Sequence, residues 1–198
     1  MDVAIINYNA GNIFSVEAAL KRIGIEPVVT DNAERIMQAD RVIFPGVGEA
    51  RSTMEFLKEQ KLDDLIRDLK QPVLGICLGM QLLCKYSEEG DTTCLGVFDV
   101  PVKRFHPHHH DQKVPHMGWN NITDVKQPLF AANQENEFVY FVHSYYVPVC
   151  EHTAAHTDYI HHFSAALHKD NFFATQFHPE KSGLQGEIIL RNFINQSL

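Results

Sequence analysis

The chain has 198 residues, of which 44% are apolar and 21% charged, as is ordinary for one soluble globular domain with a substantial core. Its net charge of −8 argues against a general nucleic-acid binder, and no apolar run approaches the length that spans a bilayer. The acidic N-terminus is unlike a secretory signal, and the four cysteines form no CxxC pair. We therefore expect a single domain over residues 1–198, with free thiols in a reducing, cytoplasmic setting and no nucleic-acid or membrane partner.

The first part of the chain alternates strand and helix patterns. Short apolar strands are predicted over residues 3–7, 27–30, 42–44 and 73–77. Helices are predicted over residues 15–23, 33–39 and 50–69, with Asp31 as N-cap of the second and a break near Gln60 in the third. Residues 81–84 are expected to begin a further helix. Such alternation with short links implies a parallel sheet with helices on both faces.

The second part of the chain is richer in β-branched and aromatic residues. Strands are predicted over residues 95–105, 137–149, 159–168 and 172–177, and an amphipathic helix over 186–194 closes the chain. We therefore expect an α/β fold with an open, mixed, mainly parallel sheet. In such sheets the reactive site lies at the carboxyl ends of the parallel strands.

Cys77 stands at one of these strand ends and is a candidate nucleophile. A nucleophile on a sharp strand-to-helix turn needs small residues two positions before and after it, and Gly75 and Gly79 occupy those positions. The dipole at a helix N-terminus also favours a thiolate. A buried core cysteine is the alternative interpretation of this segment.

His178 is a candidate base for such a thiol, although the chain has twelve histidines. It ends a predicted strand and is followed by Pro179 and Glu180, which form a stiff spacer and a carboxylate that can orient the imidazole. An incidental surface turn is the alternative interpretation of these three residues.

A glycine-containing loop follows the third predicted strand. Gly46 and Gly48 permit unusual backbone angles and leave N–H groups exposed, so this loop can supply an oxyanion-hole donor, with the Leu78 N–H as the second. Phosphate binding is a weak alternative, because this loop contains neither GxGxxG nor a Lys-Ser/Thr pair.

Six segments together resemble the class I, triad-type glutamine amidotransferases, and they occur in that family's order. They are Asn-Tyr-Asn-Ala-Gly-Asn (7–12), Pro-Gly-Val-Gly (45–48), Gly-Ile-Cys-Leu-Gly-Met-Gln (75–81), Pro-His-Met-Gly-Trp-Asn (115–120), Phe-Val-His-Ser-Tyr (141–145) and Gln-Phe-His-Pro-Glu-Lys-Ser-Gly (176–183). The segment around Cys77 identifies only the class. The fourth and sixth segments are more specific and are similar to the glutaminase subunits of imidazole glycerol phosphate synthase. The resemblance implies a flavodoxin-like core.

The resemblance also implies hydrolysis of L-glutamine to glutamate and ammonia without a cofactor or metal. It assigns Cys77 as nucleophile, His178 as acid and base, and Glu180 as the group that holds the imidazole. The oxyanion would be stabilised by the N–H groups of Val47 and Leu78. The residues expected to bind the substrate are Gly46, Gln81, Glu89, Ser144 and Tyr145, although the adjacent Glu88 leaves the register of Glu89 open.

In this family the ammonia passes to a separate (β/α)8-barrel cyclase subunit of histidine biosynthesis, so a heterodimer is expected. The residues that the resemblance places near that interface or the ammonia path are Asn12, Met117, Trp119, Asn120 and Tyr140. For Trp119, a core position is the alternative. Because an unpartnered glutaminase wastes glutamine, we expect the isolated chain to be nearly inactive, with the Gly46–Val47 peptide as the switch.

Two other functions fit the same residues. One is a stand-alone cysteine hydrolase of the same fold, similar to a γ-glutamyl peptidase, and the other is a non-catalytic adaptor. The chain departs from the family at Asn7 and Asn9, where an acidic residue and a glycine are common. The run His106-Pro107-His108-His109-His110 is interpreted as an exposed loop, with a metal site as the alternative.

Overall fold

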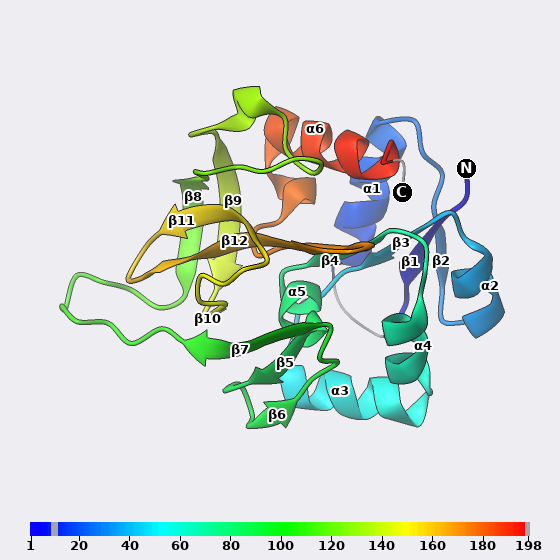
Figure 1. Ribbon diagram of the computed structural model, residues 1–198, viewed down its shortest axis with the longest axis horizontal. Coiled ribbons are helices and arrows are strands. Elements are labelled where there is room, and N and C mark those ends of the chain that lie inside the picture. Colours follow the sequence, from blue (N-terminus) through cyan, green and yellow to red (C-terminus); the bar gives the residue numbers. More distant parts are fainter. Residues whose placement is uncertain (9–11, 197–198) are drawn as a thin grey trace.

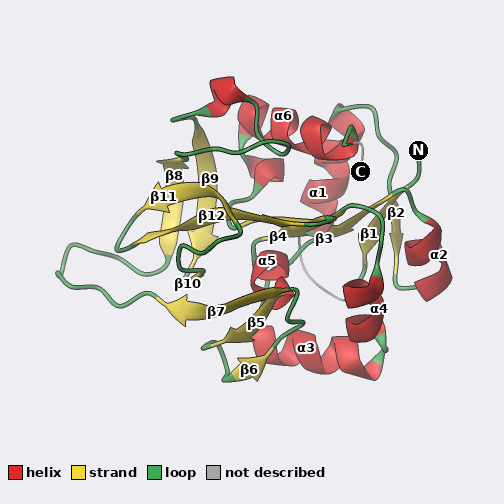
Figure 2. Cartoon of the chain, in the orientation of Figure 1, coloured by secondary structure: helices red, strands yellow, loops and turns green. Residues whose placement is uncertain are grey.

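The computed structural model describes residues 1–8 and 12–196, whose helices and strands form a layered α/β domain (Figures 1 and 2). The elements of the first half are β1 (Val3–Ile6), α1 (Ile13–Arg22), β2 (Val28–Thr30), α2 (Ala33–Gln38), β3 (Arg41–Phe44), α3 (Ala50–Glu59), α4 (Leu62–Asp68), β4 (Val73–Ile76), α5 (Leu78–Leu83), β5 (Cys84–Ser87), β6 (Thr92–Thr93) and β7 (Phe98–Arg104). Those of the second half are β8 (His116–Asn121), η1 (Ala132–Gln134), β9 (Phe138–His143), β10 (Tyr145–Tyr146), β11 (Thr153–Asp158), β12 (His162–Lys169), β13 (Phe172–Thr175), η2 (Pro179–Lys181) and α6 (Gly183–Ile194).

A seven-stranded mixed sheet forms the centre of the domain, in the order β11-β12-β13-β4-β3-β1-β2. The five strands from β13 to β2 are parallel, and β11 and β12 add antiparallel pairs at one edge. This arrangement confirms the predicted fold class. Figure 2 shows the sheet nearly edge-on, with helices on both of its faces.

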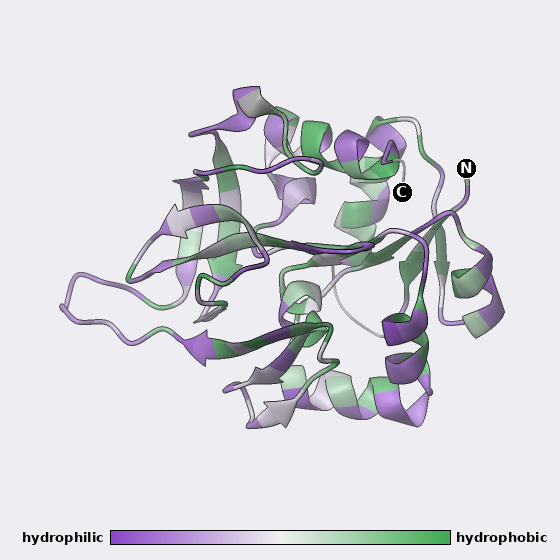
Figure 3. Cartoon of the chain, viewed as in Figure 1, coloured by the Kyte–Doolittle hydropathy of each residue, from purple (hydrophilic) through white to green (hydrophobic). Residues whose placement is uncertain are grey.

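The alternating side chains of the central strands build a separate core on each face of the sheet. In β1, Val3 and Ile5 belong to the core that α1 and α6 cover, whereas Ala4 and Ile6 belong to the core that α2 to α5 cover. Successive residues of a strand point to opposite faces, so a strand covered on both faces must be apolar throughout. The hydropathy colours of Figure 3 follow this rule along the central strands.

Two smaller sheets, which were not predicted as separate from the main one, complete the fold. One has the order β10-β7-β5-β6, and the other is the β8–β9 ribbon. Strands β5, β6, β8 and β11 were not predicted. The compositions of β8 and β11 are weakly strand-like, and their partners across the ladder, β9 and β12, stabilise them. The connection between β7 and β8 projects from the domain in Figure 1 and is hydrophilic in Figure 3, and His106 to His110 are exposed within it.

Three local details refine the predicted elements. The N-cap of α2 is Asn32, not Asp31, because the Asn32 side chain accepts a hydrogen bond from the Arg35 N–H. The prediction of a helix beginning at residue 81 was also wrong: α5 spans Leu78–Leu83, directly after the cysteine, and Cys84 begins β5. The expected break near Gln60 is confirmed by a left-handed Lys61, with φ of 56°, between α3 and α4.

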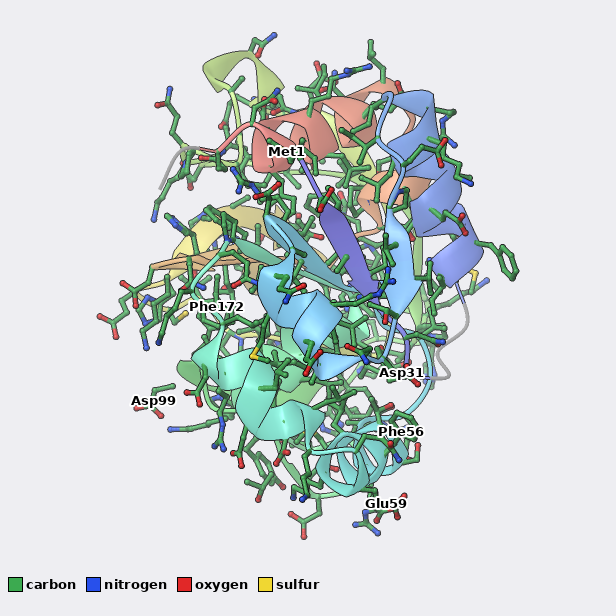
Figure 4. All side chains as sticks on the ribbon, turned by 90° about the vertical axis from the view of Figure 1, so that its right-hand side faces the viewer. Met1, Asp31, Phe56, Glu59, Asp99 and Phe172 are labelled. Atoms are coloured by element: carbon green, nitrogen blue, oxygen red, sulfur yellow. The ribbon has the colours of Figure 1, made fainter. Side chains whose placement is uncertain are left out.

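The direction of the parallel strands determines where a site can form. Met1 precedes β1 and Asp31 follows β2, and Figure 4 shows these two labelled residues at opposite ends of the strands. Loops at the carboxyl ends of β1, β3, β4 and β13 therefore meet at one edge of the sheet. Within the described residues, no helix is both long and apolar enough to span a membrane.

Candidate active site

Cys77 occupies a strained turn between β4 and α5. Its φ of 54° and ψ of −105° lie outside the regions that L-residues normally adopt, and such strain is found preferentially at functional sites. A Cβ atom built on Gly79 would lie 2.0 Å from the backbone oxygen of Phe44, and one built on Gly75 would lie 2.7 Å from Leu83. The two glycines therefore allow the close packing that this turn needs, as predicted.

The carboxyl end of β13 lies beside that of β4 and brings His178 to the cysteine. The parallel register pairs Thr175 with Ile76, so the residues that follow in both strands remain neighbours. His178 has 0% and Glu180 6% of its surface exposed, and Nδ1 of the imidazole lies 2.7 Å from Oε1 of the carboxylate. The surface-turn interpretation of this segment is therefore wrong.

The electrostatics of His178 follow from these two neighbours. Burial by itself would lower the pKa of the imidazole, but the interactions with Cys77 and Glu180 outweigh burial and raise the pKa to about 10. The Nε2 atom is buried and has no hydrogen-bond partner of good geometry among the described residues. A carboxylate, an imidazole and a thiol in this order can carry out nucleophilic acyl transfer.

Asn12 also contacts this group, although the resemblance placed it at a partner interface. Its side-chain amide donates to Oε1 of Glu180 and lies 3.5 Å from Nδ1 of His178. The residue precedes α1 and is left-handed, with φ of 77°, a conformation that Asn tolerates better than most residues. Asn12 therefore helps to fix the carboxylate. The preceding part of the predicted segment, Asn9 to Gly11, lies outside the described residues.

A cleft of about 330 Å³ opens at Cys77 and contains most of the predicted site residues. Its lining consists of Val47, Gly48, Cys77, Leu78, Gln81, Glu89, Pro115, Val142, His143, Ser144, Tyr145 and His178. Glu89 is therefore the acidic residue of the cleft, whereas Glu88 is exposed and accepts from the backbone N–H of Arg104. Burial raises the pKa of Glu89, and the N–H of Ala50 donates to its carboxylate.

The glycine loop packs directly against the turn that carries the cysteine. Gly48 has a φ of 120°, as expected for an unusual backbone angle, but Gly46 does not have a positive φ. Gly46 is needed for space instead, because a Cβ there would lie 2.5 Å from the N of Gly79. It does not line the cleft. Tyr8, which belongs to the segment 7–12 but was assigned no role there, is buried, and its hydroxyl donates to the Pro45 carbonyl.

A buried pair of histidines adjoins the cleft and was not predicted. His143 donates from Nδ1 to the carbonyl of Tyr145 over 2.7 Å, and its Nε2 lies 3.0 Å from Nδ1 of His116. Asn120 lies 3.4 Å from the remaining nitrogen of His116. Both histidines belong to segments that carried the resemblance, so that resemblance was the available signal. The pair extends from the glutamine-binding candidates to Asn120 on the β8–β9 ribbon.

The other candidates for a partner surface lie on the same ribbon. Met117 is 63% and Trp119 55% exposed, and the Trp119 ring contacts that of Tyr140 edge-on at 6.1 Å between centroids. A core position for the single tryptophan is therefore excluded. The backbone carbonyl of Tyr140 accepts from the N–H of His178, so the ribbon is tied to the catalytic candidates.

Comparisons with known proteins agree with the fold and with the geometry of the site. The family model of class I glutamine amidotransferases matches residues 4–197. The chain belongs to the class I glutamine amidotransferases. A crystal structure of a glutamine amidotransferase superposes with a TM-score of 0.74 at 20% identity, over 96% of each chain. Another, from Thermotoga maritima, has a TM-score of 0.66 at 18% identity and covers 98% of this chain and 80% of that one.

Curated relatives narrow the assignment within that class. The imidazole glycerol phosphate synthase subunit HisH of Bacteroides thetaiotaomicron is 65% identical over 98% of this chain and 100% of its own length. The protein of the same name from Pectobacterium atrosepticum is 47% identical over 98% and 99%. Within the class, the chain is a member of this HisH family.

Proposed function

We propose that the chain is the glutaminase subunit of an imidazole glycerol phosphate synthase, which hydrolyses L-glutamine to glutamate and ammonia for a separate cyclase subunit. The observation that carries the proposal is the buried arrangement of Cys77, His178 and Glu180 at the carboxyl ends of two adjacent strands. It occurs in a chain 65% identical to a HisH subunit, over nearly the full length of both.

In the proposed reaction, the Cys77 sulfur attacks the side-chain amide carbon of glutamine, and the C–N bond breaks as ammonia leaves. His178 takes the thiol proton and delivers a proton to the leaving nitrogen, while Glu180 holds the imidazole through its 2.7 Å contact with Nδ1. Water then attacks the γ-glutamyl thioester, and His178 accepts its proton. Glutamate leaves and the thiol is regenerated.

The oxyanion of each tetrahedral intermediate is assigned to the N–H groups of Val47 and Leu78. Both residues line the cleft that also contains the cysteine. Leu78 is the first residue of α5, so its N–H is one of those that a helix leaves without an internal partner. Removing one such donor lowers kcat by about 10² to 10³.

The amino-acid end of glutamine is assigned to four other residues of the cleft. Gln81, Glu89, Ser144 and Tyr145 all contribute to its lining. The carboxylate of Glu89 is a partner of the right charge for the substrate ammonium group, and Ser144 and Tyr145 offer hydroxyl and backbone groups for the carboxylate. Gly46 contributes through loop packing, because it does not line the cleft.

The exposed ribbon is the surface that we assign to the cyclase subunit. Met117, Trp119 and Phe138 leave more than half of their surfaces exposed there, and large exposed apolar groups mark interaction sites. Met117 pairs with Val142, which lines the cleft, so the same ribbon joins this surface to the place where ammonia would form. We therefore keep Met117, Trp119, Asn120 and Tyr140 as candidates for the interface or the ammonia path.

The proposal is tested by measuring glutamate release with and without the cyclase subunit and its nucleotide substrate. We expect activity that depends on both and is abolished in Cys77→Ala, with partner binding retained. High turnover by the isolated chain would instead identify a stand-alone hydrolase. Partner binding without any glutamate release from the wild type would identify a non-catalytic adaptor.

A further inference from the structure

Gln176 is a buried side chain beside the nucleophile that the proposed mechanism does not use. It follows β13 directly, as Cys77 follows β4, and the parallel register of these strands makes the two residues neighbours. Its side chain has 0% of its surface exposed, and its amide Nε2 lies 3.7 Å from the Cys77 sulfur. A buried amide of this kind must have its hydrogen bonds satisfied within the protein.

The orientation of the Gln176 amide follows from the backbone carbonyl of Tyr145, which can accept hydrogen bonds but cannot donate them. The backbone oxygen of Tyr145 lies 3.1 Å from the side-chain nitrogen of Gln81, which must therefore be Nε2. The same nitrogen lies 2.9 Å from the Gln176 side chain, which must present its oxygen there. The remaining group of Gln176, its NH₂, is then directed at the sulfur of Cys77.

The sulfur needs such a donor once it has lost its proton. In the thiol form, Sγ can donate to the Val142 carbonyl at 3.8 Å, but for a thiolate that oxygen is repulsive. Cys77 has only 7% of its surface exposed, so protein groups must supply most of the hydrogen bonds to its thiolate. A hydrogen bond to a buried charged group is stronger than one between neutral groups.

We propose that Gln176 is a further catalytic residue, whose amide N–H stabilises the Cys77 thiolate and whose oxygen is held by Gln81. This inference rests on the proposed glutaminase function and deepens it. Because both amide hydrogens of Gln81 are directed at protein oxygens, its own side-chain oxygen is left as the acceptor for a ligand in the cleft. One chain of hydrogen bonds then connects the substrate's amino-acid end to the reacting sulfur.

Two substitutions separate a donor role from a merely structural one. Gln176→Met removes the donor and the acceptor at similar length, whereas Gln176→Glu keeps an oxygen for Gln81 and replaces only the group that faces the sulfur. The matched control is Gln134→Met, because Gln134 is equally buried but bonds to Gln185 and lies outside the cleft lining. Far-UV circular dichroism and Tm identify the variants that fold.

The experiment measures iodoacetamide alkylation of Cys77 from pH 5 to 9 by peptide mass spectrometry, and kcat and KM for glutamine with the cyclase subunit. We expect both Gln176 variants to alkylate Cys77 about tenfold more slowly at pH 7, with the half-maximal pH moved upward. We also expect kcat to fall at least tenfold while KM changes less than about threefold.

Wild-type alkylation and turnover in a folded Gln176→Glu variant would overturn the proposal, because that variant has no N–H to donate and instead places a carboxyl oxygen beside the sulfur. If Gln176→Met does not fold, the alkylation and turnover of Gln176→Glu alone decide whether the proposal holds. The alkylation arm needs neither substrate nor partner. A failure of the proposed function, seen as absent glutamate release from the wild type, is therefore distinguishable from a failure of this inference.

Discussion

The buried histidine pair makes the stability of the protein sensitive to acid. His116 and His143 have 4% and 6% of their surfaces exposed, and the rings of Phe105, Phe141 and Phe163 enclose them. Burial lowers the pKa of His116 to about 4, and burial together with the nearby His116 lowers that of His143 to about 3. Both imidazoles are therefore neutral in the folded protein above about pH 5.

The sign and size of the effect follow from proton linkage. An imidazole in the unfolded chain has a pKa near 6.5, so below that pH the unfolded state binds a proton that the folded state does not bind. Stability is therefore lost as the pH falls from about 6.5 toward 4. At pH 5 the loss is about 1.5 pH units multiplied by about 1.4 kcal/mol, or about 2 kcal/mol for each histidine.

The test compares urea unfolding of the wild type and of His143→Gln at pH 8 and pH 5, followed by far-UV circular dichroism. The two proteins must be compared because other groups also contribute to the change in unfolding free energy with pH. The raised pKa of His178, for example, acts in the opposite direction. We expect His143→Gln to lose about 2 kcal/mol less than the wild type on acidification. His109→Gln, in the exposed loop, is the control.

A difference between wild type and His143→Gln smaller than about 0.5 kcal/mol would refute the reasoning, since exposed substitutions already vary by that amount. It would mean that the folded protein accepts a proton at this pair near pH 5. The buried, aromatic surroundings that we hold responsible for the low pKa values would then not lower the pKa values of the imidazoles as described.

Three further predictions concern the site itself. Gly79→Ala is expected to destabilise the fold by at least about 3 kcal/mol, because its Cβ would lie 2.0 Å from a backbone oxygen and no rotamer relieves that contact. The measurement is urea unfolding, and an unchanged midpoint would contradict the packing described. Asn12→Asp should lower kcat at least about tenfold with the cyclase subunit present, because it puts a second carboxylate beside Glu180. Asn12→Gly can still adopt the left-handed backbone conformation and should lower kcat less. Cys77→Ala should lower the pKa of His178 from about 10, as followed by imidazole NMR shifts; a titration above pH 9 in this variant would show that Glu180 alone raises it.

Much of the fold was accessible from the sequence because its signals are local. Continuous apolar runs identified the parallel strands, which are buried on both faces, and the intervening helices had clear periodicity. Strands β8 and β11 were not accessible, since a weakly strand-like segment is stabilised by the ladder it joins. The cap of α2 was assigned one residue early, because Asp31 and Asn32 are both good capping residues and only the contact with Arg35 separates them.

The sequence by itself determined the chemistry of this protein: a thiol bracketed by glycines, a His-Pro-Glu unit and the segments that place it among the class I glutamine amidotransferases. Only the tertiary structure decided which groups act on one another. Cys77 and Gln176 are 99 positions apart, and they meet because β4 and β13 are parallel neighbours in register. Asn12 likewise reaches Glu180 across 168 positions. The sequence specifies which residue types are present, whereas the hydrogen bonds that orient their side chains depend on how strands distant in the sequence pair.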